Sequence, residues 1–99
     1  MSFVTTQPDL LTAAAGDLQG IGSAMVAQNA AVAGPTTGVT PAAADEVSAI
    51  TAAQFAAQAQ MYQAVSAHAA AIHELFTTTL KTSAGAYAAA EATNTAATS

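Results

Sequence analysis

The chain has 99 residues, and 53% of them are hydrophobic by type, but 30 of the 99 are alanine. One basic residue and six acidic residues produce a formal net charge of −5, which is the wrong sign for binding nucleic acid or an anionic membrane surface through charge. No cysteine is present, which excludes disulfides, thiolate metal sites and thiol nucleophiles. At this length we expect one domain, covering residues 1–99.

The first predicted helix begins at Pro8. Thr6 offers a capping hydroxyl, and Pro8 suits the first helical turn because its missing N–H would have no partner there. Asp9 complements the positive end of the helix dipole. We expect this helix to cover residues 8–32.

Two prolines and two glycines lie within residues 34–41, which is typical of a turn between helices. We therefore predict a turn at residues 33–40. Thr40 and Pro41 repeat the capping pattern of the first helix, so we expect the second helix to cover residues 41–82. In residues 83–99 the only large apolar side chain is Tyr87, and a loose tail is predicted there.

The apolar residues of both predicted helices recur at alternating spacings of three and four, which is typical of amphipathic helices. The first helix has one such stripe, whereas the second has two stripes that are rotated from each other. One short antiparallel neighbour cannot cover both of them. The pattern therefore predicts an all-α antiparallel hairpin that needs further helices from a partner to complete a four-helix bundle.

Candidate catalytic or cofactor residues are not evident. His68 and His73 are five residues apart, whereas two histidines on one helix face need a spacing of three or four to share a metal. The chain has neither a Gly-x-Ser-x-Gly elbow nor a glycine-rich phosphate loop ending in lysine. We expect no enzymatic activity, no cofactor, no metal and no small-molecule substrate.

Tyr87 and Glu91 are four residues apart, which places an aromatic ring and a carboxylate on one face if this segment is helical. An aromatic residue beyond the predicted core is available to a receptor. This pair is the strongest functional candidate in the sequence.

Several sequence features together resemble the mycobacterial PE proteins. They are residues 1–8 (MSFVTTQP) followed by an acid, the alanine-rich helices, the Pro35-Thr36-Thr37 turn, and the Tyr87-x-x-x-Glu91 pair. The resemblance covers nearly the whole chain and is strongest to members linked with the ESX-5 type VII secretion system. The family takes its name from Pro-Glu, whereas this chain has Pro8 and Asp9, a change that keeps the charge. The chain is similar to short members that have no C-terminal extension, so we expect no second activity downstream.

The resemblance implies an obligate heterodimer with a PPE protein and export by a type VII secretion system. Tyr87 and Glu91 would then be the secretion signal, and a chaperone would contact mainly the PPE partner. The exported protein would act at the cell envelope or as a secreted factor, after a cytosolic stage. We expect the interfaces within the hairpin and with the partner to use Leu11, Leu18, Ile21, Met25, Phe55, Tyr62, Val65, Ile72 and Phe76.

Two other hypotheses compete with the PPE heterodimer. In the first, two copies of the hairpin associate into a homodimeric helical bundle with a structural role. In the second, the protein is a membrane-associated component of the outer envelope, although it lacks the basic residues that usually attract a helix to the membrane interface.

Overall fold

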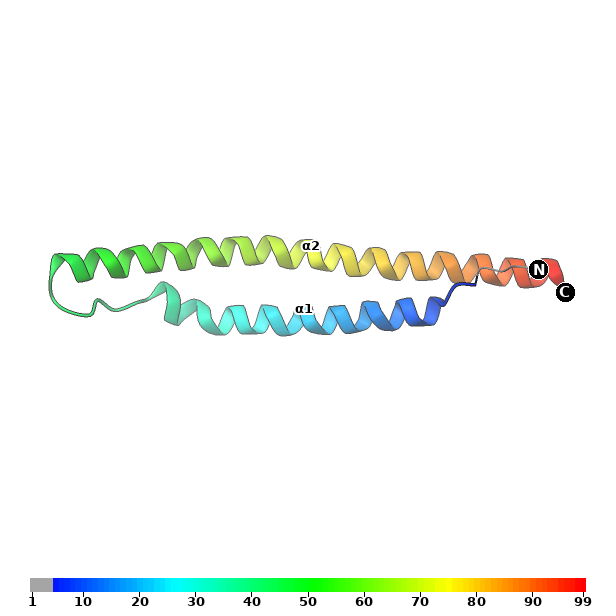
Figure 1. Ribbon diagram of the computed structural model, residues 1–99, viewed down its shortest axis with the longest axis horizontal. Helices are drawn as coiled ribbons and strands as arrows, with labels where there is room; N and C mark the ends of the chain where they lie inside the picture. The colour runs from blue at the N-terminus through cyan, green and yellow to red at the C-terminus, as the bar shows by residue number, and fades with distance from the viewer. Residues whose placement is uncertain (1–4) are drawn as a thin grey trace. The chain divides into compact units, whose positions relative to one another are not determined.

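A computed structural model describes residues 5–99, and residues 1–4, which belong to the N-terminal motif of the resemblance, lie outside them. The described residues form two helices, α1 (Pro8–Thr37) and α2 (Glu46–Thr98), of 30 and 53 residues (Figure 1). They contain no strand, so this part of the chain is all-α, as the sequence pattern predicts.

The contacts divide the chain into two compact units. The terminal unit contains the described residues up to Gly22 together with Ile72–Ser99, and the loop unit contains Ser23–Ala71. Each unit therefore pairs part of α1 with part of α2. In the terminal unit Thr6 bonds Glu91, and Gln19 bonds Lys81, so residue numbers rise along one helix as they fall along the other. The two segments of this unit are antiparallel.

The end of α1 differs from the predicted turn at residues 33–40, because the helix continues through Pro35 to Thr37. A proline disfavours helical geometry in the residue before it, but that residue is Gly34, whose missing Cβ removes the clash. The hydroxyls of Thr36 and Thr37 donate to the carbonyls of Val32 and Ala33, at 2.6 and 2.7 Å. These side-chain bonds supplement the backbone hydrogen bonds near the end of the helix. The Gly34 carbonyl, one of the last four of the helix, accepts the Gly38 N–H at 3.0 Å.

The start of α2 also differs from the prediction, since the helix begins at Glu46 and not at residue 41. Asp45 supplies the cap: one carboxylate oxygen accepts the Ser48 N–H at 2.8 Å, and the other accepts the Ser48 hydroxyl at 2.9 Å. The Ser48 N–H, and then the hydroxyl, lower the pKa of the Asp45 carboxyl. An aspartate caps a helix more strongly than a threonine such as Thr40, on which the predicted start at residue 41 was based.

The predicted loose tail at residues 83–99 is helical through Thr98. Its alanines favour the helix, and hydroxyls of Thr93, Thr95 and Thr98 donate to carbonyls four residues earlier. The tail is also packed, because Ala84 is buried and Glu91 is half-buried. The absence of large apolar residues therefore did not prevent this segment from packing on α1.

The helix contacts in each unit are made mainly by small or polar side chains, together with the half-buried Leu11, Leu18 and Leu80 in the terminal unit. Ala15, Ala52, Thr77 and Ala84 are the buried residues among those described. On α2 most of the buried and half-buried positions follow one another at spacings of three or four. They are Ser48, Ala52, Ala56, Ala59, Gln63, Ser66 and Ala70 in the loop unit, and His73, Thr77, Leu80, Ser83, Ala84 and Glu91 in the terminal unit. Small side chains at these positions let the two backbones approach closely.

Candidate functional site

The predicted interface residues lie mostly outside the contacts between α1 and α2. Leu11 and Leu18 are half-buried in the terminal unit. The other seven have exposed fractions between 50 and 68%, and they are Ile21, Met25, Phe55, Tyr62, Val65, Ile72 and Phe76. These seven side chains are therefore only partly covered within the hairpin, and their role against a partner remains a prediction.

Five of the exposed apolar residues of α2 make up what we call the outer face, defined as Phe55, Tyr62, Val65, Ile72 and Phe76. In the loop unit the spacings of seven and three, and in the terminal unit the spacing of four, place the members of each group on one side of the helix. Phe55, Tyr62 and Val65 belong to the loop unit, and Ile72 and Phe76 to the terminal unit. Exposed apolar residues that gather on one helix face are typical of a protein-binding surface.

In the loop unit the outer face borders an open hollow of about 430 Å³. Phe55 and Tyr62 of α2 line it together with Val32 and Pro35 of α1. The Tyr62 hydroxyl donates to the Asn29 side-chain oxygen at 2.7 Å, which restrains the ring. The role of Asn29 is not evident from the sequence, because an asparagine inside an alanine-rich helix carries no local signal for a contact 33 residues away.

A second hollow of the loop unit lies along α2, where Thr51, Gln54 and Gln58 surround Phe55. These three polar side chains are exposed. The outer face therefore combines apolar area with hydrogen-bonding groups, and such a mixture allows one protein partner to be distinguished from another.

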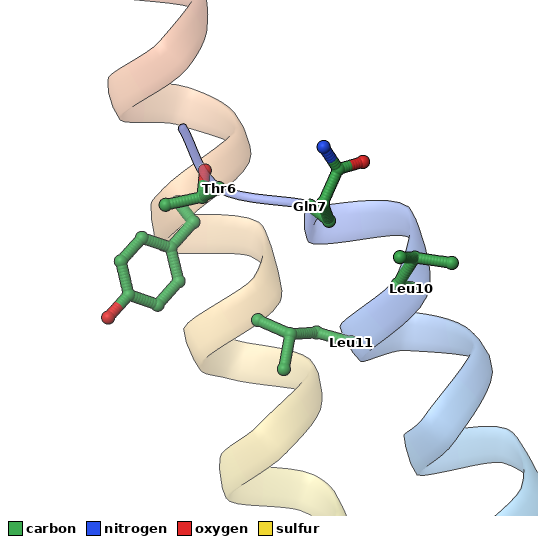
Figure 2. A pocket seen from close by; sticks show the side chains of 5 residues that line it. Thr6, Gln7, Leu10 and Leu11 are labelled. Atoms are coloured by element: carbon green, nitrogen blue, oxygen red, sulfur yellow. The ribbon is translucent and has the colours of Figure 1, made fainter. Parts of the chain in front are cut away.

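Tyr87 and Glu91 lie in the terminal unit, one turn apart on α2. Tyr87 is 48% exposed, and Glu91 is half-buried. The Thr6 hydroxyl donates to Glu91 Oε1 at 3.0 Å. Although Tyr87 lies beyond the predicted core, it lines a hollow with Thr6, Gln7, Leu10 and Leu11. In Figure 2 the Leu11 side chain is directed toward α2.

Pro8 and Asp9, the predicted N-terminal motif, form the first turn of α1 in the terminal unit. Pro8 is half-buried, and its carbonyl accepts the Thr12 hydroxyl at 3.1 Å. Asp9 is exposed at the positive end of the helix, where a carboxylate is favourable. Both residues serve the helix start, and neither contributes to the hollow beside Tyr87.

The two histidines differ in their surroundings. His68 is exposed, whereas His73 is half-buried in the terminal unit, with Nε2 bonded to the Leu18 carbonyl. Residues 5–99 contain no group of three or more His, Cys, Asp or Glu side chains that could hold a metal ion. Neither helix in this part of the chain has a stretch apolar enough to span a membrane.

A comparison with known proteins identifies the family to which these features belong. The sequence profile of the PE family matches residues 4–94. The chain belongs to the PE family. It is 64% identical over 99 residues to the PE family protein PE13 of Mycobacterium tuberculosis, a match that covers all of both chains.

Other PE relatives are longer than this chain. The chain is 56% identical over 97 residues to PE8 and 55% identical over 93 residues to PE cleavage protein A, both of Mycobacterium tuberculosis. These matches cover 98 and 94% of this PE chain, but 35 and 17% of the two relatives. Membership of the family, with the exposed outer face, fits a protein that works by binding another protein.

Proposed function

We propose that this PE protein is a non-enzymatic subunit that forms an obligate heterodimer with a PPE protein and is exported with it by a type VII secretion system, ESX-5 by resemblance. Tyr87 and Glu91 form the export signal. The exported pair acts at the mycobacterial envelope or as a secreted factor. The observation that carries this proposal is the exposed outer face of α2.

The size of the outer face supports a large partner. Burying a large apolar side chain contributes about 1.5–3 kcal/mol, and the five residues of the outer face are 50 to 68% exposed. Covering them with a partner contributes roughly 5–9 kcal/mol in total to the free energy of binding. The loss of translational and rotational freedom on association costs about 4–15 kcal/mol, so burial of the outer face alone gives at most a small net free energy of binding. A stable pair therefore also needs contacts with the exposed Ile21 and Met25 of α1.

Two further helices are the simplest structure that meets this requirement. A helix pair laid along α1 and α2 covers exposed residues of both, and shallow crossing angles suit the small side chains of the chain. Charge contributes little to such an interface, because the chain has only seven charged residues. Selectivity among PPE proteins then depends on shape and on polar groups such as Gln54 and Gln58.

The first test is co-expression with candidate PPE proteins, followed by size-exclusion chromatography and thermal melting monitored by circular dichroism. We expect a broad transition for the chain alone and a sharp one with its partner. A sharp transition and a dimeric mass for the chain alone would contradict the obligate heterodimer and support self-association.

Two matched variants locate the interface. Val65→Asp places a charge on the outer face, whereas Ala67→Asp places the same charge at an exposed position rotated by about 200° around α2. We expect Val65→Asp to abolish the complex and Ala67→Asp to preserve it, while both retain their helicity. Equal binding by the two variants would show that the outer face does not contact the partner.

The export signal is tested by Tyr87→Ala in a strain that secretes the wild-type pair. We expect the variant to accumulate inside the cell as an intact complex, because the outer face is unchanged. Secretion at the wild-type level would contradict the assignment of the signal.

A further inference from the structure

The proposed export signal is in contact with the other end of the chain. Thr6 precedes α1, yet its hydroxyl donates to Glu91 Oε1 at 3.0 Å, across 85 residues of sequence. The acceptor is half-buried, so water competes less for this bond than at a fully exposed site. Because Glu91 carries a charge when ionised, the bond belongs to the stronger, charge-assisted class.

Tyr87 lies beside the same N-terminal segment. It lines an open hollow of about 480 Å³ together with Thr6, Gln7, Leu10 and Leu11. Figure 2 shows the last four residues, with Leu10 and Leu11 on the first turn of α1 and Thr6 ahead of the helix. The Thr6 to Leu11 segment therefore borders both members of the signal pair.

This arrangement changes what a receptor has to recognise. A signal on a loose tail must be ordered when it binds, and the lost backbone freedom weakens the binding. Here the helix that carries Tyr87 and Glu91 is already formed, and Thr6 holds one oxygen of the Glu91 carboxylate. The other oxygen accepts no hydrogen bond from the described part of the protein, and the Tyr87 side chain remains about half exposed.

We propose that Thr6 is a positioning residue for the export signal: its hydroxyl fixes the Glu91 carboxylate, and the Thr6 to Leu11 segment forms one recognition surface with Tyr87 and Glu91. This inference rests on the proposed function of Tyr87 and Glu91 as the signal. The receptor is the component of the secretion machinery that binds the pair, and its affinity depends on the Thr6 hydroxyl.

The test compares three variants of the full chain in a strain that exports it. Thr6→Val removes the hydroxyl and keeps the shape of the side chain, Thr6→Ser keeps the hydroxyl, and Thr5→Val makes the same change at an exposed neighbour. We expect Thr6→Val to lower the exported fraction by about threefold to tenfold, the effect of one lost hydrogen bond at a site that water partly reaches. Thr6→Ser and Thr5→Val should stay within about twofold of the wild type.

Amide hydrogen exchange of the purified protein provides a readout that does not depend on export. Loss of the Thr6 bond should accelerate exchange in α2 around Glu91, and Thr6→Ser should restore the protection. A merely structural role for the Thr6 methyl group predicts the opposite pattern, because valine keeps a methyl and serine does not.

The possible outcomes separate this inference from the function on which it rests. If Tyr87→Ala blocks export while Thr6→Val is exported normally, the signal assignment stands and the positioning role of Thr6 is refuted. Increased export of Thr6→Val also refutes it, since the contact would then mask the signal. If Tyr87→Ala is exported normally, the signal assignment fails and the inference falls with it.

Discussion

Replacing Gly22 by alanine tests how closely α1 and α2 approach in the terminal unit. A Cβ at Gly22 would lie 2.5 Å from Cδ2 and 2.7 Å from Nε2 of His73. Favourable contacts between such atoms need about 3.5–4.0 Å, so the imidazole must move by about 1 Å. That movement strains the hydrogen bond between His73 and the Leu18 carbonyl, because the bond is made by the same nitrogen.

Two opposing terms determine the size of the effect. Overpacking of this kind costs about 1–3 kcal/mol. Alanine in place of glycine stabilises a helix by about 1 kcal/mol. The net change for Gly22→Ala is therefore a loss of about 0–2 kcal/mol in the free energy of unfolding. Gly20→Ala is the matched control, since nothing lies within 4 Å of its new Cβ, and it should gain about 1 kcal/mol.

The assay is urea and thermal denaturation followed by circular dichroism, on the chain alone or with its partner if the chain alone gives no cooperative transition. The two variants should differ by about 1–3 kcal/mol, which corresponds to at least about 4 °C in Tm. In a His73→Ala background the contact is removed, and Gly22→Ala should then stabilise about as much as Gly20→Ala. Equal stabilisation by both substitutions in the wild-type background would refute the close approach.

Two further predictions concern the contact between α1 and α2 and the Asp45 cap of α2. Ala15→Leu should lower the free energy of unfolding by about 1–3 kcal/mol, because Ala15 is fully buried. Ala14→Leu at the exposed neighbour should change it by less than about 0.5 kcal/mol. Equal denaturation midpoints for the two variants would show that Ala15 does not lie in the contact between the helices. The lowered pKa of Asp45 means that its cap is fully formed above the ordinary aspartate value of about 3.9 and is lost as the pH falls through the lower folded value. The amide shift of Ser48 should therefore titrate below about pH 3.9 and should not titrate in Asp45→Asn, and a midpoint at or above that value would refute the cap.

Local patterns predicted the helices but misplaced three of their ends. Pro35 and Pro41 favour breaks in a helix, whereas Gly34, which has no Cβ, lets α1 continue through Pro35. Asp45, the cap of α2, was missed in the prediction, although an aspartate three residues before a serine is a local signal that could have been found. The tail was misjudged because only large apolar residues were counted as packing residues.

The candidate site was predicted in part, for a different reason. The Tyr87 and Glu91 pair could be found from its four-residue spacing alone. The contact of Glu91 with Thr6 could not, because it joins residues 85 positions apart and depends on which faces of the two helices meet. The same holds for Asn29 with Tyr62 and for Gly22 with His73.

The alanine-rich composition, interrupted by prolines and glycines, is enough to predict two helices, and the apolar spacing shows that the longer helix carries more apolar surface than the shorter one covers. The face of α2 that packs on α1 is evident only in the folded protein. Periodicity shows which residues share a face of a helix but does not show which face packs against a neighbouring helix. Here the face with small side chains packs on α1. Close approach of two backbones favours alanine, serine and glycine in the contact. The large apolar residues of the outer face therefore remain exposed.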